Sequence, residues 1–337
     1  MKTGLHDFHV QNGAKMVPFS GWSMPLSYGD VGQSTAFYYQ FLLYFHIQNT
    51  LSHLNPLVFR GPNATAFLER LTPSSLTSLA PFFSTLSVLL LPHGGILDDT
   101  IITKHAPDAY YVVTNAGRRT EDLAWFGKQY SEWKEGDLEW EVMDGWGLVA
   151  LQVHVARGGY TGEDGFEISI PQEHTVSLTS KLTESPSVQL AGLGARDSLR
   201  LEAGMCLYGN DLDESTTPVE AALSWVIGKE RREKGGFVGA ETVLKQLKEG
   251  PPRRRIGLLV EGAPARHGAK IFSKDSEPLG TVTSGIPSPT LGKNIAMGYV
   301  RSGAHKKGTE LLVEVRGKMR PAVVTPMPFV PAKYWRG

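Results

Sequence analysis

A short stretch near the middle of the chain concentrates side chains that could bind a ligand or carry a proton. Residues 158–171 read GGYTGEDGFEISIP and hold three carboxylates, one tyrosine and four glycines. Because Phe166, Ile168 and Ile170 alternate along an expected strand, Glu167 lies on its opposite face. A carboxylate on that face points either to water or into a pocket.

The runs before and after this turn alternate apolar and polar residues, which predicts an antiparallel hairpin. Gly162 and Gly165 are expected to supply positive φ in its loop. For Glu163 and Asp164 the more ordinary interpretation is a solvated acidic tip, since charged side chains are mostly exposed.

A second carboxylate pair occurs in GGILDDTI, where Asp98 and Asp99 are adjacent within an expected buried strand. Adjacent strand residues point to opposite faces, so at most one of the two is expected to face a given ligand. Burying an unpaired carboxylate is costly, so the inner one needs a specific partner. The alternative is a pair at a turn that caps backbone amides.

Arginines supply the opposite charge on an expected helix over residues 196–203. Arg196 and Arg200 share one face of it, and Asp197 lies three residues before Arg200. A planar guanidinium can clamp a carboxylate through two hydrogen bonds. A surface ion pair that contributes little to stability is the competing interpretation.

Composition excludes several classes of function. Lys plus Arg and Asp plus Glu number 34 each, so no net field attracts nucleic acid or an anionic membrane. The single cysteine, Cys206, excludes an intramolecular disulfide and a cysteine-based zinc cluster. No apolar run is long enough to span a membrane. The motifs of nucleotide-binding, zinc-protease and serine-hydrolase sites are absent, and no metal site is predicted.

A chain of 337 residues predicts two or three domains. Strands are expected at 85–91 and 110–114, a helix at 118–133, and an irregular acidic loop at 208–214. Residues 229–252 resemble a charged linker. Six short strands then predict an all-β sandwich or barrel, at 256–260, 269–272, 280–284, 295–300, 311–315 and 322–325.

Long and uncommon strings along most of the chain resemble the aminomethyltransferase, or T-protein, family of the glycine cleavage system. The strings are GAKMVPFSGWSMPLSYG, GGILDDTI, YYVVTNAG, GYTGEDG, GLGARDSLRLEAGMCLYGNDLDESTTPVEAALSW, GTVTSGIPSPTLGKNIAMGYV and PFVPAKY. The resemblance implies an α+β, multidomain, cloverleaf-like fold with a C-terminal β-barrel or sandwich. Its folate-binding domain would comprise 1–53 and 137–249, a second α+β domain 54–136, and the barrel domain 250–337.

The resemblance also implies a reaction, in which the methylene carbon of a lipoyl-bound aminomethyl group passes to tetrahydrofolate, ammonia is released and 5,10-methylenetetrahydrofolate forms. By the family pattern Asp99 is the catalytic acid, and the folate-binding residues are Asn115, Tyr160, Glu167, Arg196 and Tyr334. The partner would be the lipoyl-bearing carrier (H) protein, and a monomer is expected. Location in the mitochondrial matrix is implied, with no transit peptide visible.

Two stretches depart from the family pattern. Residues 33–58 are aromatic and nearly uncharged where a charged helix and a strand of the folate pocket are expected. At the join between Gln152 and Val153 several tens of residues are missing, which should leave an open sheet edge. An altered splice product or gene-model variant explains both.

Other functions remain open at this point. One is a catalytically impaired pseudoenzyme that keeps the scaffold, and another is a non-catalytic folate-binding relative. The iron–sulfur-assembly relatives are a form of it, but their KGCYxGQE-like string is absent. Demethylating flavoenzymes would need an additional dinucleotide-binding domain.

Overall fold

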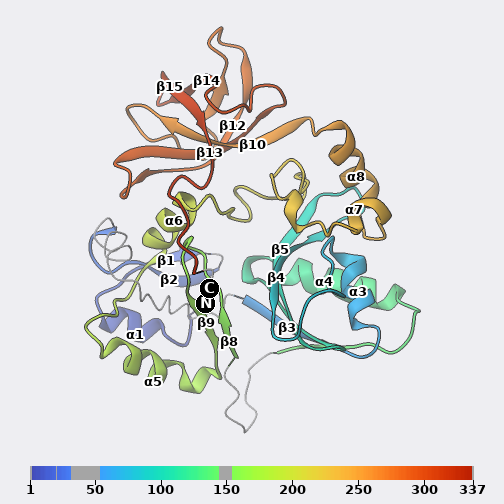
Figure 1. Ribbon diagram of the computed structural model, residues 1–337. Helices are drawn as coiled ribbons and strands as arrows, with labels where there is room; N and C mark the ends of the chain where they lie inside the picture. Colours follow the sequence, from blue (N-terminus) through green and yellow to red (C-terminus); the bar gives the residue numbers. More distant parts are fainter. Residues whose placement is uncertain (1, 20, 32–53, 144–153, 336–337) are drawn as a thin grey trace. The chain divides into compact units, whose positions relative to one another are not determined.

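The computed structural model describes residues 2–19, 21–31, 54–143 and 154–335 (Figure 1). The chain divides into two compact units. Unit 1 comprises Met1–Thr50, Gly145–Asp211 and Arg255–Gly337, and unit 2 comprises Leu51–Asp144 and Leu212–Arg254. Most of the unusual segment 33–58 and the join at 152–153 lie outside the described residues. The three-domain division stays a prediction.

Unit 2 is built on a five-stranded antiparallel sheet with the strand order β4-β5-β6-β3-β7. The predicted strands at 85–91 and 110–114 are confirmed as β4 and β6. The bounds are β3 (Leu54–Arg60), β4 (Ser84–Leu90), β5 (Ile96–Ala106), β6 (Ala109–Asn115) and β7 (Glu139–Val142).

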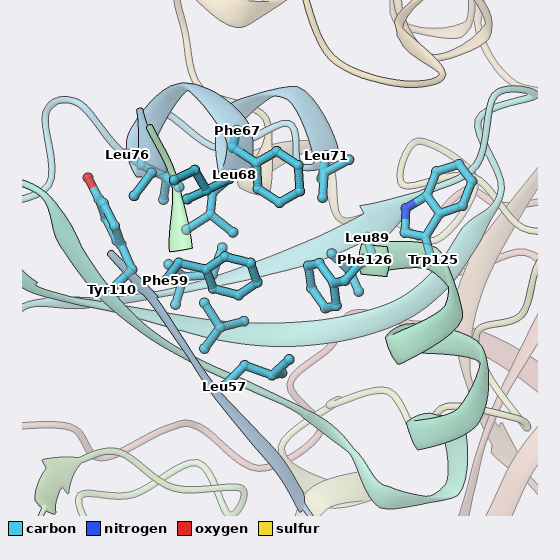
Figure 2. Close-up of a cluster of buried hydrophobic side chains, with 14 of the residues drawn as sticks. Leu57, Phe59, Phe67, Leu68, Leu71, Leu76, Leu89, Tyr110, Trp125 and Phe126 are labelled. Carbon is cyan, nitrogen blue, oxygen red and sulfur yellow. The ribbon is translucent and has the colours of Figure 1, made fainter. Parts of the chain in front are cut away.

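Two helices, α3 (Ala64–Leu71) and α4 (Arg119–Glu132), pack their apolar sides on this sheet (Figure 2). The helix predicted at 118–133 is therefore confirmed to within one residue at each end. The Phe59 ring lies 5.2 Å from that of Phe126 and 6.0 Å from that of Trp140, centroid to centroid. Each such buried side chain contributes about 1.5–3 kcal/mol, so this cluster fixes the strand ends that carry the polar residues.

The prediction of a linker at 229–252 is wrong. The segment contains α7 (Arg231–Lys234) and α8 (Ala240–Glu249), which follow the 3-10 turn η2 (Ser224–Val226). Gly239 adopts φ +79°, and a Cβ there would lie 2.6 Å from the Leu91 carbonyl oxygen. The charged residues of α8 lie on its outer side, while Val243 is fully buried. A packed amphipathic helix therefore has the same charged composition as a linker, which is why the prediction failed.

Unit 1 begins with α1 (His6–Gln11) and the hairpin β1 (Lys15–Phe19)–β2 (Trp22–Ser27). A second hairpin pairs β8 (His154–Arg157) with β9 (Phe166–Ser169), as predicted. Helices α5 (Gln172–Thr183) and α6 (Leu193–Glu202) follow it. Among the described residues no third strand joins β8 and β9, so both edges of that sheet lack a described partner strand.

The C-terminal strands form a closed barrel in the order β10-β13-β12-β11-β14-β15, so of the two predicted architectures the barrel is correct. Alternation along β14 turns Leu311, Val313 and Val315 into its interior. All six predicted strands are present: β10 (Arg253–Val260), β11 (Lys270–Phe272), β12 (Pro278–Ser288), β13 (Lys293–Arg301), β14 (Glu310–Val315) and β15 (Lys318–Thr325).

Candidate functional site

The six residues predicted for the site fall into two groups, one in each unit. Asp99 and Asn115 belong to unit 2. The other four belong to unit 1 and are Tyr160, Glu167, Arg196 and Tyr334. Within each group the structure brings side chains together.

In unit 2, Asn115 at the end of β6 bridges the two adjacent aspartates of β5. Its backbone N–H donates to Asp98 Oδ2 at 2.8 Å, and its side-chain amide donates to Asp98 Oδ1 at 2.8 Å and to Asp99 Oδ1 at 2.9 Å. Asp98 is fully buried and Asp99 is half-buried. The inner carboxylate therefore has the specific partner that the sequence required.

The expectation that the two carboxylates face apart holds for burial but not for hydrogen bonding. The last residue of β6 that pairs with β5 is Thr114, opposite Thr100. Asn115 lies one residue beyond that pair, just before the turn η1 (Ala116–Arg118), so its amide reaches both aspartates. The result is a half-buried carboxylate, Asp99, held by a neutral donor.

In unit 1, Arg196 on α6 stacks on Tyr160 of the hairpin loop. The guanidinium carbon lies 4.5 Å from the ring centroid, a cation–π distance. The Tyr160 hydroxyl donates to the backbone carbonyl of Cys206. These contacts hold a planar cation and an aromatic ring in fixed positions, which suits binding of a flat heteroaromatic ligand.

Glu167 lies on β9 between Phe166, which is 46% exposed, and the half-buried Ile168. The side chain is exposed, yet enough protein surrounds the carboxyl for desolvation to raise its pKa. The charge of Arg196 opposes this and lowers the pKa. A carboxylate and a guanidinium that influence each other in this way can bind the donor and acceptor edges of one ring.

Tyr334 lies on the C-terminal tail, which crosses the loop between β8 and β9. The backbone N–H of Lys333 donates to the Gly162 carbonyl at 2.9 Å, and the Lys333 ammonium lies 3.6 Å from Glu163 Oε1. Desolvation and the charge of Asp164 raise the pKa of Tyr334. The tail thus fixes the tyrosine beside the hairpin that carries Tyr160.

The interpretation of Glu163 and Asp164 as a solvated tip is wrong for Glu163, whereas Asp164 keeps a side chain that is 35% exposed. Glu163 is only 4% exposed, and desolvation raises its pKa. Asp164 accepts hydrogen bonds from Arg157 and from the backbone N–H of Trp335. The tail comes from the far end of the chain, so no local pattern could reveal it. Gly162 adopts φ +80° as predicted, whereas the prediction of positive φ at Gly165 is wrong.

Sequence reasoning missed the ionic network that joins α6 to the barrel. Arg200 is 2% exposed and donates to Asp211 Oδ2 at 2.7 Å and to Ser284 Oγ at 2.9 Å. It also pairs with Asp197, but a surface ion pair does not describe a buried guanidinium. Asp211 lies in the segment predicted as an irregular acidic loop. The signal that could have revealed the network is the pair of apolar neighbours of Arg200, Leu199 and Leu201, which are both buried.

Neither a metal cluster nor a membrane-spanning helix is found in the described part of the chain. No three His, Cys, Asp or Glu side chains there are placed to hold one ion. No described helix has the length and apolar character needed to cross a bilayer.

Two family models together match most of the sequence. The model described as the GCVT N-terminal domain matches residues 5–152 and 132–231, and the model of the glycine cleavage T-protein C-terminal barrel domain matches residues 253–331. The fold is that of the aminomethyltransferases, with α+β units and a six-stranded C-terminal barrel. The chain belongs to the glycine cleavage T-protein family.

Relatives from distant organisms match over nearly the whole length. The probable mitochondrial aminomethyltransferase of Schizosaccharomyces pombe is 46% identical over 369 residues, covering 99% of this chain and 94% of that protein. The human mitochondrial aminomethyltransferase is 42% identical, covering 99% and 91%. The crystal structure of aminomethyltransferase T from Bartonella henselae superposes with a TM-score of 0.90 at 34% identity, covering 100% of this chain and 99% of that one.

The comparisons also bear on the join at Gln152 and Val153. The first match to the N-terminal family model ends at residue 152. The alignment with the Schizosaccharomyces protein spans 369 positions, more than the 337 residues of this chain, so the relative carries residues that this chain lacks. Despite this, the full-length similarity does not favour a non-catalytic relative over an aminomethyltransferase.

Proposed function

We propose that this chain transfers the methylene carbon of an aminomethyl group to tetrahydrofolate, with release of ammonia, as the aminomethyltransferase of a glycine cleavage system. The observation that carries the proposal is Asp99. In a sequence similar to aminomethyltransferases along its whole length, it is a half-buried carboxylate fixed by the amide of Asn115 at 2.9 Å. Such a group can hold a proton or steady positive charge at a fixed position.

Tetrahydrofolate, bound as a substrate, supplies the nitrogen nucleophile. The residues of the chain then have to orient the reactants, exclude water and manage protons, and proximity alone can account for much of a rate enhancement. In this proposal Asp99 accepts or relays the proton of the reacting nitrogen. Asn115 keeps the carboxylate in place and donates a hydrogen bond to it.

The residues of unit 1 are proposed to bind the pterin and its extensions. Glu167 would accept two parallel N–H bonds from a guanidine-like ring edge, for which a carboxylate has the right geometry. Arg196 and Tyr160, stacked at 4.5 Å, would bind the opposite edge and one ring face. Tyr334, held on the hairpin by the tail, would line the same ligand. These roles follow the family pattern, and the contacts within unit 1 support them.

The aminomethyl group is proposed to arrive on the lipoyl arm of the carrier (H) protein with which this family works. We further propose that the chain acts in the mitochondrial matrix, because the Schizosaccharomyces and human relatives are named as mitochondrial proteins, and that it acts as a monomer. Light scattering of the purified chain, alone and mixed with lipoylated carrier, tests the stoichiometry.

The test of the activity measures ammonia and 5,10-methylenetetrahydrofolate formed from aminomethyl-loaded carrier protein and tetrahydrofolate. Both products should form in equal amounts and depend on both substrates. Calorimetric titration with tetrahydrofolate is the companion measurement. Folate binding without either product would reject the transferase proposal and identify a non-catalytic folate-binding protein.

A further inference from the structure

Behind Asp99 lies a second acidic pair that the proposed reaction does not use. Asp98 on β5 and Asp122 in the first turn of α4 are both 0% exposed. The carboxyl group of Asp98 and the hydroxyl of Thr114 lie beside the Asp122 carboxyl group, although neither makes a hydrogen bond of ordinary geometry with it. Two buried carboxyl groups that face each other cannot both be ionised without a large penalty.

A count of donors shows which carboxyl group lacks partners. Both oxygens of Asp98 receive hydrogen bonds from Asn115. Within the described residues, by contrast, neither oxygen of Asp122 has a hydrogen-bond partner under ordinary geometric criteria, and the same holds for Thr114 Oγ1. A proton on the pair removes the conflict, because an acid O–H can donate to the facing carboxylate.

Burial and the surrounding charges together favour the protonated form of the pair. Burial, followed by the charges of Asp122 and Asp99, raises the pKa of Asp98 well above its usual range, against the hydrogen bonds from Asn115. Burial raises the pKa of Asp122 to about 7, with a smaller contribution in the same direction from the negative charge of Glu121. Interactions with Thr114, Asp98 and Arg118 lower this pKa in part.

We propose that Asp98 and Asp122 share one proton at neutral pH, and that Asp122 is a positioning residue that acts through Asp98 and Asn115 on Asp99. The connection is continuous: Asp122 faces Asp98, Asp98 binds the Asn115 amide, and that amide binds Asp99. Loss of the shared proton places a second negative charge on the pair and disturbs the amide that fixes Asp99. The effect on Asp99 rests on the proposed function, whereas the shared proton does not.

The shared proton predicts a pH dependence of stability with a definite sign. An acid whose pKa is higher in the folded than in the unfolded state stabilises the fold below its unfolded pKa, about 4, and loses this contribution as the pH rises through the folded pKa. The free energy of unfolding should therefore contain a term that falls between about pH 4 and 7. Asp122→Asn should remove it, because an amide donates to Asp98 at every pH.

The control is Glu121→Gln, which removes a carboxylate one residue earlier on the same helix, where the side chain is 46% exposed. Urea unfolding from pH 5 to 8 compares the wild-type chain with both variants. The wild type and Glu121→Gln should show the falling term, and Asp122→Asn should show a flatter profile. Identical slopes in the two variants would overturn the shared proton.

Infrared spectroscopy reads the proton directly and does not depend on a variant that folds. With 13C at the aspartate carboxyl carbons, buried glutamic acids do not contribute to the shifted band. The wild-type chain should show a protonated aspartic acid band at pH 6 that weakens as the pH rises past about 7, the pKa of Asp122. Absence of that band at pH 6 rejects the pair.

The positioning role has its own readout, the pH profile of kcat. An alkaline decline near the titration of the pair is expected for the wild type and Glu121→Gln, and it should be missing in Asp122→Asn. A kcat profile that Asp122→Asn leaves unchanged would overturn the positioning role. An inactive wild-type chain would reject the proposed function, and the infrared result would still decide whether the proton is shared.

Discussion

Arg157 donates two hydrogen bonds to one oxygen of Asp164, from Nε at 3.0 Å and from Nη2 at 2.7 Å. The other oxygen of Asp164 accepts the backbone N–H of Trp335 at 2.6 Å, and Arg157 also reaches the Trp335 carbonyl at 3.0 Å. Hydrogen bonds from Trp335 and Arg157 lower the pKa of Asp164, so the carboxylate stays ionised at neutral pH. The Arg157–Asp164 pair thus helps to hold the C-terminal tail on the hairpin, together with the contacts of Lys333.

Removing this carboxylate by Asp164→Ala should weaken tetrahydrofolate binding several-fold, because it releases Trp335, the residue that follows Tyr334 in the tail. The value of kcat at saturating folate should change little. Calorimetric titration measures the affinity, with Glu173→Ala, an exposed carboxylate on α5, as the control. Equal affinities for Asp164→Ala and the control would show that the tail does not position a folate-binding residue.

Asp99→Asn should lower kcat by about 10²-fold or more, the usual contribution of a positioned acid or base, while folate affinity stays within a few-fold. The substitution removes the charge and keeps the shape and the Asn115 contact. Steady-state kinetics with aminomethyl-loaded carrier protein give the comparison. If Asp98→Asn has the larger effect on kcat in a chain that remains folded, the assignment of Asp99 is wrong.

Arg196→Lys should weaken folate binding although it conserves the charge, because an ammonium group lacks the planar surface that stacks on Tyr160. The matched variant is Arg301→Lys on the barrel, whose ion pair with Glu277 is 60% and 54% exposed. Titrations of both variants under the same conditions decide the matter. Unchanged folate affinity and turnover in Arg196→Lys would reduce the stacked pair to a structural contact.

Arg200→Met should destabilise unit 1 by about 3–5 kcal/mol, since it leaves the buried Asp211 carboxylate without its cation. Arg301→Met removes an exposed ion pair and should cost no more than about 1 kcal/mol. Urea unfolding of both variants measures the difference. Coincident unfolding midpoints would contradict the view that the α6 network supports the barrel.

Restoring the residues that relatives carry should make the chain more stable. A variant with the Schizosaccharomyces sequence at positions 33–58 and at the 152–153 join would add sheet neighbours to β8 and β9. At about 25 cal/mol per Å², a few hundred Å² of newly buried apolar surface is worth several kcal/mol. Thermal melts of both chains provide the test, and equal melting temperatures would show that the departures are tolerated.

Periodic patterns predicted much of the fold. The six barrel strands repeat their apolar residues at the spacing that one buried face requires, so the sequence alone located them. The segment with α7 and α8 was not recognised, because its burial depends on distant partners such as Arg70, whose carbonyl accepts the Val238 N–H.

The candidate site was predictable to the extent that each residue belongs to a local string. The stacking of Arg196 on Tyr160 joins two such strings, and only the tertiary structure brings them together. The burial of Asp122 was invisible for a similar reason. It lies in a helix with mixed charges that looked solvated, and its partner is a carboxylate on a strand.

The order in which the chain is synthesised separates the two units in time. All residues of unit 2 precede Arg255, whereas unit 1 needs the barrel and the tail, which are made last. Until then the Arg200 guanidinium has no Ser284 to bind, and Asp164 has no Trp335. On the ribosome unit 2 can fold while the hairpin and α6 wait, so we expect nascent chains to expose apolar surface of unit 1 and to recruit chaperones until the last strand is released.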